Sequence, residues 1–519
     1  MISNALKARS KYYWVITLFV ALLAYGFAII NYTVYPDDEW FFNSPFGILQ
    51  QGRWGDYLTT RIFDYHIFLP FWRGVIALTL FVISSTIWCY IFQNALRKHF
   101  DEKIAIAFTS VFLSFGFMSR YYIYVSTKLS LGMSFFVTPI AVYYTLKYLN
   151  DKNNKLLNLF CASFLLAYAV SFSENSMIMF LIGVFIVHFL NKFFDDNSEK
   201  TIFKLYLINL LKIFLIVILA IFLWRFIANF LLFVNNIQPS DYTSNMIVYN
   251  LSSLSAFINS ILVFMQNFVP ILVRRASISY IIYNFIFIST FIVLIISIYK
   301  SYRLKNVYLL LDGILVIISS FSLILITGNV NYLPERTFIP FGMLCGFAFV
   351  LLHILIKGSE FNKTIKRSYF TFAVNFMLVL TVFYQTKEMN EEFVTNYQRY
   401  QLDVTVMNNI MHDLGGITIQ KPIEFVGILP PYNTRHYEVT GSSIFYLDRA
   451  WLTSEELNSN RPYNFINMHG YHIIQAKTNE NIIKEQIKGM PNYPNDGYIK
   501  DFGDYIIVKL GKSAFDVSE

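Results

Sequence analysis

The sequence predicts an α-helical polytopic membrane protein, with about eleven transmembrane helices in residues 1–385 and a small extracytoplasmic α/β domain in residues 386–519. Three observations predict this fold class. Hydrophobic residues make up 55% of the chain and charged residues only 14%, whereas soluble proteins average about 25% charged residues. The apolar residues gather in runs long enough to cross a bilayer, and the composition becomes polar after residue 385.

Each predicted span is an apolar run near the ~20 residues that a transmembrane helix needs. The predicted spans are 13–30, 75–92, 104–118, 131–146, 156–172, 177–190, 211–232, 281–299, 307–327, 339–356 and 370–384. The first span follows Lys7, Arg9 and Lys11, as a signal peptide would. Its apolar stretch is longer than the usual signal-peptide core, so we expect it to remain as a membrane anchor.

The basic residues predict how these spans are oriented. Lys and Arg gather in the loops 97–98, 147–155, 192–204, 300–305 and 357–367. Because cytoplasmic loops carry an excess of Lys and Arg, the N-terminus is expected in the cytoplasm and the C-terminal domain outside. Counting the apolar run 251–273 as a further span would move the later basic loops outside. We therefore interpret it as an interfacial or re-entrant helix that ends at Arg274 and Arg275.

The last part of the chain predicts a small mixed domain. Short strand-like runs occur at 423–429, 471–475 and 505–510, and helical periodicity fits 389–414 and 479–487.

Composition also excludes several classes of protein. The net charge of +8 comes from short loop clusters, not from the continuous basic face of a nucleic-acid-binding protein. Cys89, Cys161 and Cys345 all fall in apolar runs, so no disulfide framework is expected. The histidines are scattered and form no HExxH motif, so no zinc site is expected.

The first outer loop, residues 31–73, is the most informative stretch for function. It exceeds the about 2–8 residues that join helices in a compact bundle. Asp37, Asp38 and Glu39 lie just beyond the first span, and the aromatic residues Trp40 and Phe41 follow them. Carboxylates placed where a helix leaves the membrane can abstract a proton from a sugar hydroxyl. The competing interpretation is a solvated acidic loop beside an interfacial aromatic belt.

Two short motifs in this loop resemble those of a known family. The segment YPDDEW, residues 35–40, is followed by GRWGDYL, residues 52–58. This arrangement resembles the glucosyltransferase II type, the serotype-converting O-antigen glucosyltransferases of bacteria, which are similar in layout to the GT-C class of membrane glycosyltransferases. The family pattern is closer to DDW followed by GRPL. This chain differs by Glu39 before Trp40 and by the absence of a proline after Arg53.

The resemblance implies a function and a location. It implies transfer of a hexose, expected to be glucose, from undecaprenyl or another polyprenyl phosphate to a bacterial surface glycan such as the O-antigen of lipopolysaccharide. The enzyme would lie in the bacterial cytoplasmic membrane. The lipid-linked sugar donor and the glycan acceptor are its implied partners. No cofactor is implied, and the metal requirement stays open.

The resemblance also implies an inverting mechanism with an aspartate base. Asp37 or Asp38 would deprotonate the acceptor hydroxyl, and analogy with GT-C enzymes favours Asp37. Adjacent residues on a helix point about 100° apart, so only one of the two is expected to act as the base. Glu174, in the short turn between the predicted fifth and sixth spans, is a second candidate acid. Its competing interpretation is a plain polar turn residue.

The leaving phosphate gains negative charge and is best stabilised by fixed cations, preferably arginine. Candidates predicted on the outer face are Arg53, Arg120, Lys128, Arg274, Arg275 and Arg336. Each of them is also interpretable as a snorkelling anchor of a neighbouring span.

Three other functions compete with that of a glycosyltransferase. A transporter or lipid-linked sugar flippase usually shows internal repeats and polar residues near the membrane midplane. This sequence shows no repeat, few charges near the midplane and instead an acid-rich outer loop. A surface-polysaccharide polymerase is expected to rely on basic residues in a large outer loop, without an acidic pair after the first span. A membrane sensor would leave the many spans unexplained. The glycosyltransferase is preferred, with the polymerase and the flippase or transporter as alternatives.

Overall fold

The structure is a computed structural model that describes residues 1–7, 9–35, 38–39, 46–63, 69–151, 153–193, 203–238, 255, 258–259, 279–327, 335–357, 364–416, 421–429, 444–445, 460–476 and 478–511. The chain divides into two compact units. The membrane unit comprises residues 1–30, 46–122 and 127–392, and the C-terminal unit comprises residues 31–45, 123–126 and 393–519. Two short segments from the first third of the sequence therefore belong to the C-terminal unit.

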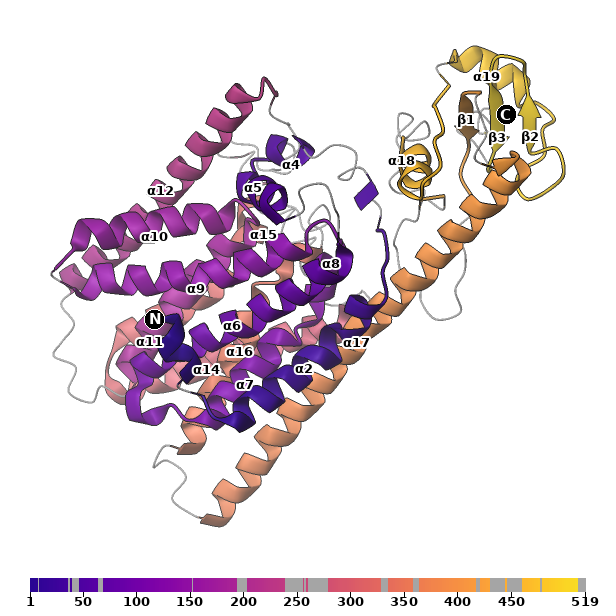
Figure 1. Cartoon of the computed structure of the whole chain (residues 1–519). Helices are drawn as coiled ribbons and strands as arrows, with labels where there is room; N and C mark the ends of the chain where they lie inside the picture. Colours follow the sequence, from indigo (N-terminus) through magenta and orange to yellow (C-terminus); the bar gives the residue numbers. More distant parts are fainter. Residues whose placement is uncertain are drawn as a thin grey trace. The chain divides into compact units, whose positions relative to one another are not determined.

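The described secondary-structure elements of the membrane unit are all helices (Figure 1). In chain order it holds α1 (Ile2–Lys7), α2 (Lys11–Ile30), α4 (Phe46–Gln50), α5 (Trp54–Phe63), α6 (Pro70–Leu96), η1 (Arg97–His99), α7 (Glu102–Leu113), η2 (Gly116–Met118), α8 (Ser119–Tyr122), α9 (Lys128–Asn150), α10 (Lys155–Val170), α11 (Asn175–Phe193), α12 (Phe203–Val234), α14 (Ser279–Leu304), α15 (Val307–Thr327), η4 (Glu335–Phe338) and α16 (Phe341–Lys357). Helix α17 (Thr364–Asp413) belongs to this unit as far as Glu392 and to the C-terminal unit beyond it.

Many of these helices can cross a membrane. Among the described residues, eight are long and apolar enough, or nine if α7 and the η2–α8 segment, bent by 45°, form one broken span. Helices α10 and α15 are apolar but shorter. These helices indicate a multi-pass membrane protein. Each predicted span overlaps a helix, although residues 114–115, 171–172 and 339–340 of three of these spans are not helical. The total of about eleven crossings stays a prediction. The interfacial helix predicted at 251–273 lies almost entirely outside the described residues.

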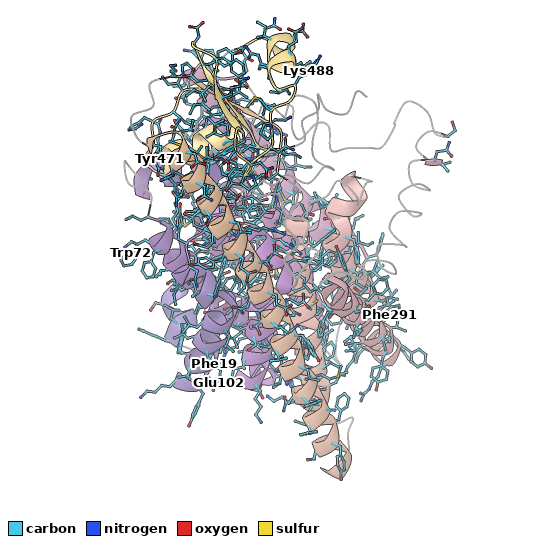
Figure 2. All side chains as sticks on the ribbon, turned by 90° about the vertical axis from the view of Figure 1, so that its right-hand side faces the viewer. Phe19, Trp72, Glu102, Phe291, Tyr471 and Lys488 are labelled. Carbon is cyan, nitrogen blue, oxygen red and sulfur yellow. The ribbon has the colours of Figure 1, made fainter. Side chains whose placement is uncertain are left out.

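The surface of the membrane unit suits contact with lipid. Phe19, Trp72 and Phe291 project outward from the helices (Figure 2), and each side chain is more than half exposed. Inside the unit, small residues let helices approach closely: a Cβ added at Gly132 of α9 would lie 2.8 Å from the Cα of Ala77 on α6. Apolar side chains outside and small residues at helix contacts are typical of membrane bundles.

The first outer loop, which is longer than a plain helix–helix connection, contains the two short helices α4 and α5. These helices are held by packing and not by length. Leu49, Trp54 and Tyr57 form a buried cluster with Ala228 and Leu232, near the C-terminal end of α12. Short helices are marginal alone, so their tertiary contacts stabilise them here.

The C-terminal unit contains a three-stranded mixed sheet in the order β1-β3-β2. Strand β1 (Ile423–Val426) pairs in parallel with β3 (Ile506–Lys509), which pairs antiparallel with β2 (Ile499–Asp501). The other described helices of this unit are α18 (Arg461–Met468) and α19 (Glu480–Gln486). The predicted strands at 423–429 and 505–510 contain β1 and β3, and the helix predicted at 479–487 contains α19.

The strand predicted at 471–475 does not form as a separate element. This segment makes only an isolated parallel bridge between Gln475 and Ile423 of β1. Ile474 O accepts from Ile423 N, and Ala476 N donates to Ile423 O. Because the backbone pairs at this one position of β1, the alternation that suggested a strand does not extend into a ladder.

Glu424 on β1 is a buried carboxylate in the core of the C-terminal unit. Its Oε2 has no hydrogen-bond partner among the described residues. Burial raises the pKa of Glu424 from 4.5 to about 7. Since the folded-state pKa lies above the unfolded value, the stabilisation that Glu424 provides is complete below pH 4.5 and is lost as the pH rises through 7.

We therefore expect the C-terminal unit to be less stable at pH 8 than at pH 5, by about 2 to 3 kcal/mol from Glu424 alone. Glu424→Gln should flatten this dependence and raise the unfolding temperature at pH 8. Thermal unfolding of the detergent-solubilised full chain at both pH values measures it. Glu485→Gln, at an exposed position on α19, is the matched control. An unchanged pH profile in Glu424→Gln would contradict the assignment.

Candidate functional site

The acid loop, residues 31–39, begins where α2 ends, and the structure describes residues 31–35 and 38–39 of it. Asp38 is completely buried. Its carboxylate accepts hydrogen bonds from Tyr35 N at 3.0 Å, Val125 N at 3.0 Å, Ser126 N at 2.9 Å and Ser126 Oγ at 2.6 Å. Burial raises the pKa of Asp38, and the hydrogen bonds from Ser126, Tyr35 and Val125 oppose that rise.

These contacts give Asp38 a structural role. A carboxylate offers about four acceptor positions, and four donors already occupy those of Asp38. The carboxylate joins the acid loop to segment 123–126, where Tyr35 also packs edge-on against Tyr124. Asp37, Trp40 and Phe41, the other candidates predicted in this loop, lie outside the described residues.

The rest of the acid loop is bound to the helical and sheet core of the C-terminal unit. Val34 belongs to its hydrophobic cluster, together with Tyr400 and Phe465. Asn396 Nδ2 donates to Thr33 Oγ1 at 2.9 Å. Contacts with α17 therefore fix the start of the loop.

Glu39, which distinguishes this chain from the family pattern, is also completely buried. Arg461 Nη1, at the start of α18, lies 3.2 Å from Glu39 Oε1. An ion pair with one fully buried member is sensitive to loss of either partner, because desolvation of the remaining charge is then uncompensated. Glu39 thus attaches the far end of the acid loop to α18.

Arg461→Gln is expected to destabilise the C-terminal unit by about 1 to 3 kcal/mol, since part of Arg461 is exposed and screened by solvent. The double variant Glu39→Gln/Arg461→Gln should recover part of this loss, because it removes both charges and leaves no buried carboxylate without Arg461. Thermal unfolding of the two single variants and the double variant forms a double-mutant cycle. Additive effects of the two substitutions would show that the pair does not couple the loop to α18.

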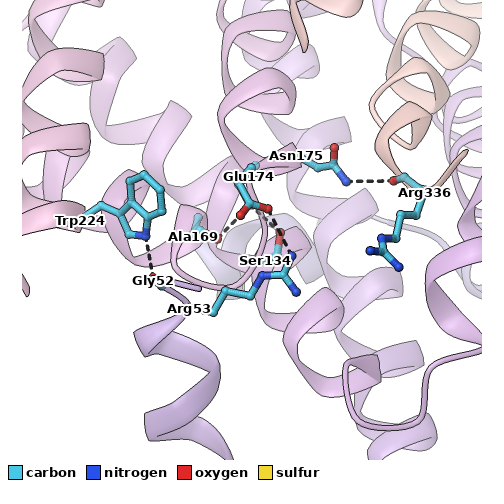
Figure 3. A network of polar contacts seen from close by, with 9 residues as sticks. Gly52, Arg53, Ser134, Ala169, Glu174, Asn175, Trp224 and Arg336 are labelled. Carbon is cyan, nitrogen blue, oxygen red and sulfur yellow. Dashed lines mark hydrogen bonds and ion pairs between the residues drawn. The ribbon is translucent and has the colours of Figure 1, made fainter. Parts of the chain in front are cut away.

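A second group of polar residues lies in the membrane unit, around the GRWGDYL motif. Gly52 has a φ of +78°, a conformation that favours glycine. Trp224 Nε1 of α12 donates to Gly52 O at 2.8 Å, and a Cβ on Gly52 would lie 3.3 Å from the Trp224 ring (Figure 3). A Cβ on Gly55 would lie 2.1 Å from Ser171 Oγ. The two glycines therefore let α5 approach both α12 and the turn between α10 and α11.

This close approach brings two predicted site residues together. Arg53 Nη2 lies 3.6 Å from Glu174 Oε2 in the α10–α11 turn (Figure 3). The next residue, Asn175, donates from Nδ2 to Arg336 O at 3.0 Å. The turn is itself fixed, because Ser176 Oγ donates to Ala169 O at 3.0 Å. Arg53, Glu174 and Arg336 thus come from three distant parts of the sequence to one turn.

Asp56 adds a buried acid beside Arg53, one turn further along the chain. Burial raises the pKa of Asp56, and the Ser130 hydroxyl, the charges of Arg73 and Arg53, and a hydrogen bond from Thr60 oppose the rise. No role was assigned to Asp56 or Arg73 from the sequence. The available signal was the three-residue spacing of Arg53 and Asp56 in GRWGD. Arg53 directly precedes α5, and the residue before a helix lies close to the third residue of that helix. We call Arg53, Asp56, Glu174 and Arg336 the arginine site.

The other predicted cations are engaged elsewhere. Arg120 Nη1 of α8 lies 2.8 Å from Glu392 Oε2 of α17. Lys128 is buried at the start of α9, where its Nζ donates to Ala28 O at 3.0 Å and lies over the Tyr122 ring. Arg274 and Arg275 lie outside the described residues. Within the described ranges, no three His, Cys, Asp or Glu side chains are grouped so that they could hold a metal ion.

Comparison with known proteins places the chain in a family. The sequence pattern of the family described as glucosyl transferase GtrII matches residues 26–353. This range includes the acid loop and the arginine site, and it ends before α17. No curated protein and no solved structure gave a match. Because the family match covers more than half of the chain, this protein belongs to the glucosyl transferase GtrII family.

Proposed function

We propose that this protein transfers glucose from polyprenyl phosphate to a bacterial surface glycan such as O-antigen. Membership of the GtrII family supports a glucosyltransferase that acts on a surface glycan. The geometric observation that carries the proposal is the ion pair between Arg53 and Glu174, built by the GRWGDYL motif inside the matched range. It presents a guanidinium and a carboxylate, which are groups that bind phosphate oxygens and sugar hydroxyls.

Asp37 is the proposed base. Its carboxylate takes the proton of the acceptor hydroxyl as the acceptor oxygen attacks the anomeric carbon of the donor sugar. The bond between that carbon and the phosphate oxygen breaks, and its electron pair leaves with polyprenyl phosphate, so the anomeric configuration inverts. The buried, fully hydrogen-bonded carboxylate of Asp38 favours Asp37 for this role, with Asp38 as a positioning residue.

Arg53 and Arg336 are the proposed phosphate-binding residues. The departing phosphate gains negative charge, and fixed guanidinium groups stabilise that charge more in the transition state than in the ground state. Glu174 orients Arg53 and is available to a sugar hydroxyl, since its side chain is 39% exposed. Arg274 and Arg275 stay candidates for the lipid phosphate, and Trp40 and Phe41 for contacts with the lipid or the sugar.

The proposed location is the bacterial cytoplasmic membrane. The N-terminus lies in the cytoplasm and the C-terminal unit outside, and the distribution of Lys and Arg among the loops supports this orientation. The mature glycan and the lipid-linked donor meet on the outer face in this arrangement. No cofactor is proposed, because the donor is already activated by its phosphate.

The test is expression in a bacterium that makes polyprenyl-phosphoglucose, followed by mass spectrometry of the surface polysaccharide repeat. One added hexose per repeat is expected with the wild-type chain and none in a host without it. A host unable to make the lipid-linked donor should also show no addition. Altered glycan chain length without added hexose would instead favour a polymerase, and altered donor orientation a flippase.

A further inference from the structure

Tyr121 of α8 carries a buried hydroxyl to which no described residue assigns a structural role. The residue is 4% exposed, and its Oη has no hydrogen-bond partner among the described residues. Buried polar atoms are nearly always paired, because leaving one unpaired forfeits its hydration without a replacement. An orphan hydroxyl in a native protein is therefore a reason to look for a missing ligand.

The surroundings of this hydroxyl indicate what that ligand is. The helix that carries Tyr121, α8, packs against η4, which carries Arg336. The charged groups of Arg53, Glu174, Asp56 and Arg336 lie close enough to act on the Tyr121 phenol. They are the four residues of the arginine site, contributed by α5 and the turn before it, the α10–α11 turn and η4. The Tyr121 hydroxyl thus lies beside that site, although no pattern in the sequence selects this residue.

The backbone that carries Tyr121 is held in place on both sides. The neighbouring Tyr122 donates from Oη to Gly74 O at 2.9 Å, and Ser119 Oγ donates to Gly116 O at 2.8 Å. Gly116 N in turn donates to Gln385 Oε1 of α17 at 3.1 Å. Because these bonds fix the bend between α7 and α8, the phenol is positioned before any ligand arrives.

We propose that Tyr121 Oη donates a hydrogen bond to a phosphate oxygen of the lipid-linked donor in the arginine site. This proposal rests on the proposed function. A phenol is a neutral donor, and a phosphate oxygen between guanidinium groups accepts further donors. As the bond to the sugar breaks, the phosphate becomes more negative and this hydrogen bond strengthens. Tyr121 accordingly contributes to the rate of transfer more than to binding of the intact donor.

The substitution Tyr121→Phe tests this role, because it deletes only the hydroxyl. Transfer by the purified full-length protein should fall about 10- to 100-fold, the loss expected for one hydrogen bond to a charged group. Without ligand, its unfolding temperature should equal or exceed that of wild type, since the hydroxyl loses no hydrogen bond to any described residue. Tyr25→Phe is the matched control: it removes a buried hydroxyl that donates to Leu113 O at 3.0 Å, and should lower stability with little effect on the transfer rate.

Stabilisation by phosphate is the second measurement. Thermal unfolding is followed with added polyprenyl phosphate in one arm and inorganic phosphate in the other, for wild type and Tyr121→Phe. A smaller upward shift in the variant is expected, in both arms if the phosphate alone is recognised and in the lipid arm only if the lipid is required. Equal shifts together with an unchanged transfer rate would overturn the proposal. Absence of transfer by wild type would count against the proposed function, and the phosphate shifts would still test Tyr121.

Discussion

Asp37→Asn is expected to lower hexose transfer by about 10²- to 10⁴-fold, the range for loss of a general base. The amide cannot take the proton of the acceptor hydroxyl, whereas its size and shape are nearly those of the carboxylate. The variant should therefore insert in the membrane and unfold at the wild-type temperature. Added hexose per glycan repeat, measured by mass spectrometry, together with the amount of protein in the membrane, reports both properties.

Asp38→Asn provides the matched comparison one residue away. An asparagine amide has a single oxygen, so the donors that face the second carboxylate oxygen, Tyr35 N and Val125 N, would meet an NH₂ group. We expect a lower unfolding temperature, because each buried donor left unpaired costs about 1 to 3 kcal/mol. Full stability with no transfer in Asp38→Asn, and normal transfer in Asp37→Asn, would reverse the two roles.

Arg53→Gln is expected to lower kcat by about 10²- to 10³-fold, as removal of one fixed donor to a developing negative charge does elsewhere. The residue is held by the Gly52 turn and by Glu174, so its guanidinium is positioned before the donor binds. Arg53→Lys should recover only part of the rate, because an ammonium cannot form the two parallel hydrogen bonds of a guanidinium.

Initial rates at varied donor concentrations measure this effect. A fall in kcat with a nearly constant KM indicates an interaction made in the transition state, and a rise in KM alone would indicate uniform binding of the donor. Lys421→Gln removes the exposed ion pair with Asp501 in the C-terminal unit and is the control for loss of a positive charge. Wild-type kinetics in Arg53→Gln would exclude Arg53 from the phosphate site.

The aromatic and acidic motifs of the first outer loop were visible in the sequence, but the roles of their individual residues could be predicted only in part. YPDDEW places two aspartates side by side, and periodicity does not distinguish an exposed carboxylate from a buried one. The difference for Asp38 comes from Val125 and Ser126, nearly ninety positions away. Likewise, Arg120 and Arg53 were equivalent candidates in the sequence. Their partners, Glu392 for one and Glu174 for the other, separate them in the structure.

The sequence by itself determined the membrane character of this protein, its helical stretches and the two motifs that resemble its family. These features are local: a helix in lipid must satisfy its own backbone and be apolar over about 20 consecutive residues, so a contiguous run is sufficient evidence. Only the tertiary structure decided that Asp38 is an anchor, that Glu39 contacts Arg461 and that Arg53 contacts Glu174. It also decided that the Tyr121 hydroxyl has no hydrogen-bond partner among the described residues. Each of these features depends on residues that are distant in sequence. Close packing at positions such as Gly52 and Gly55 brings such residues together, and no periodicity in the sequence predicts these contacts.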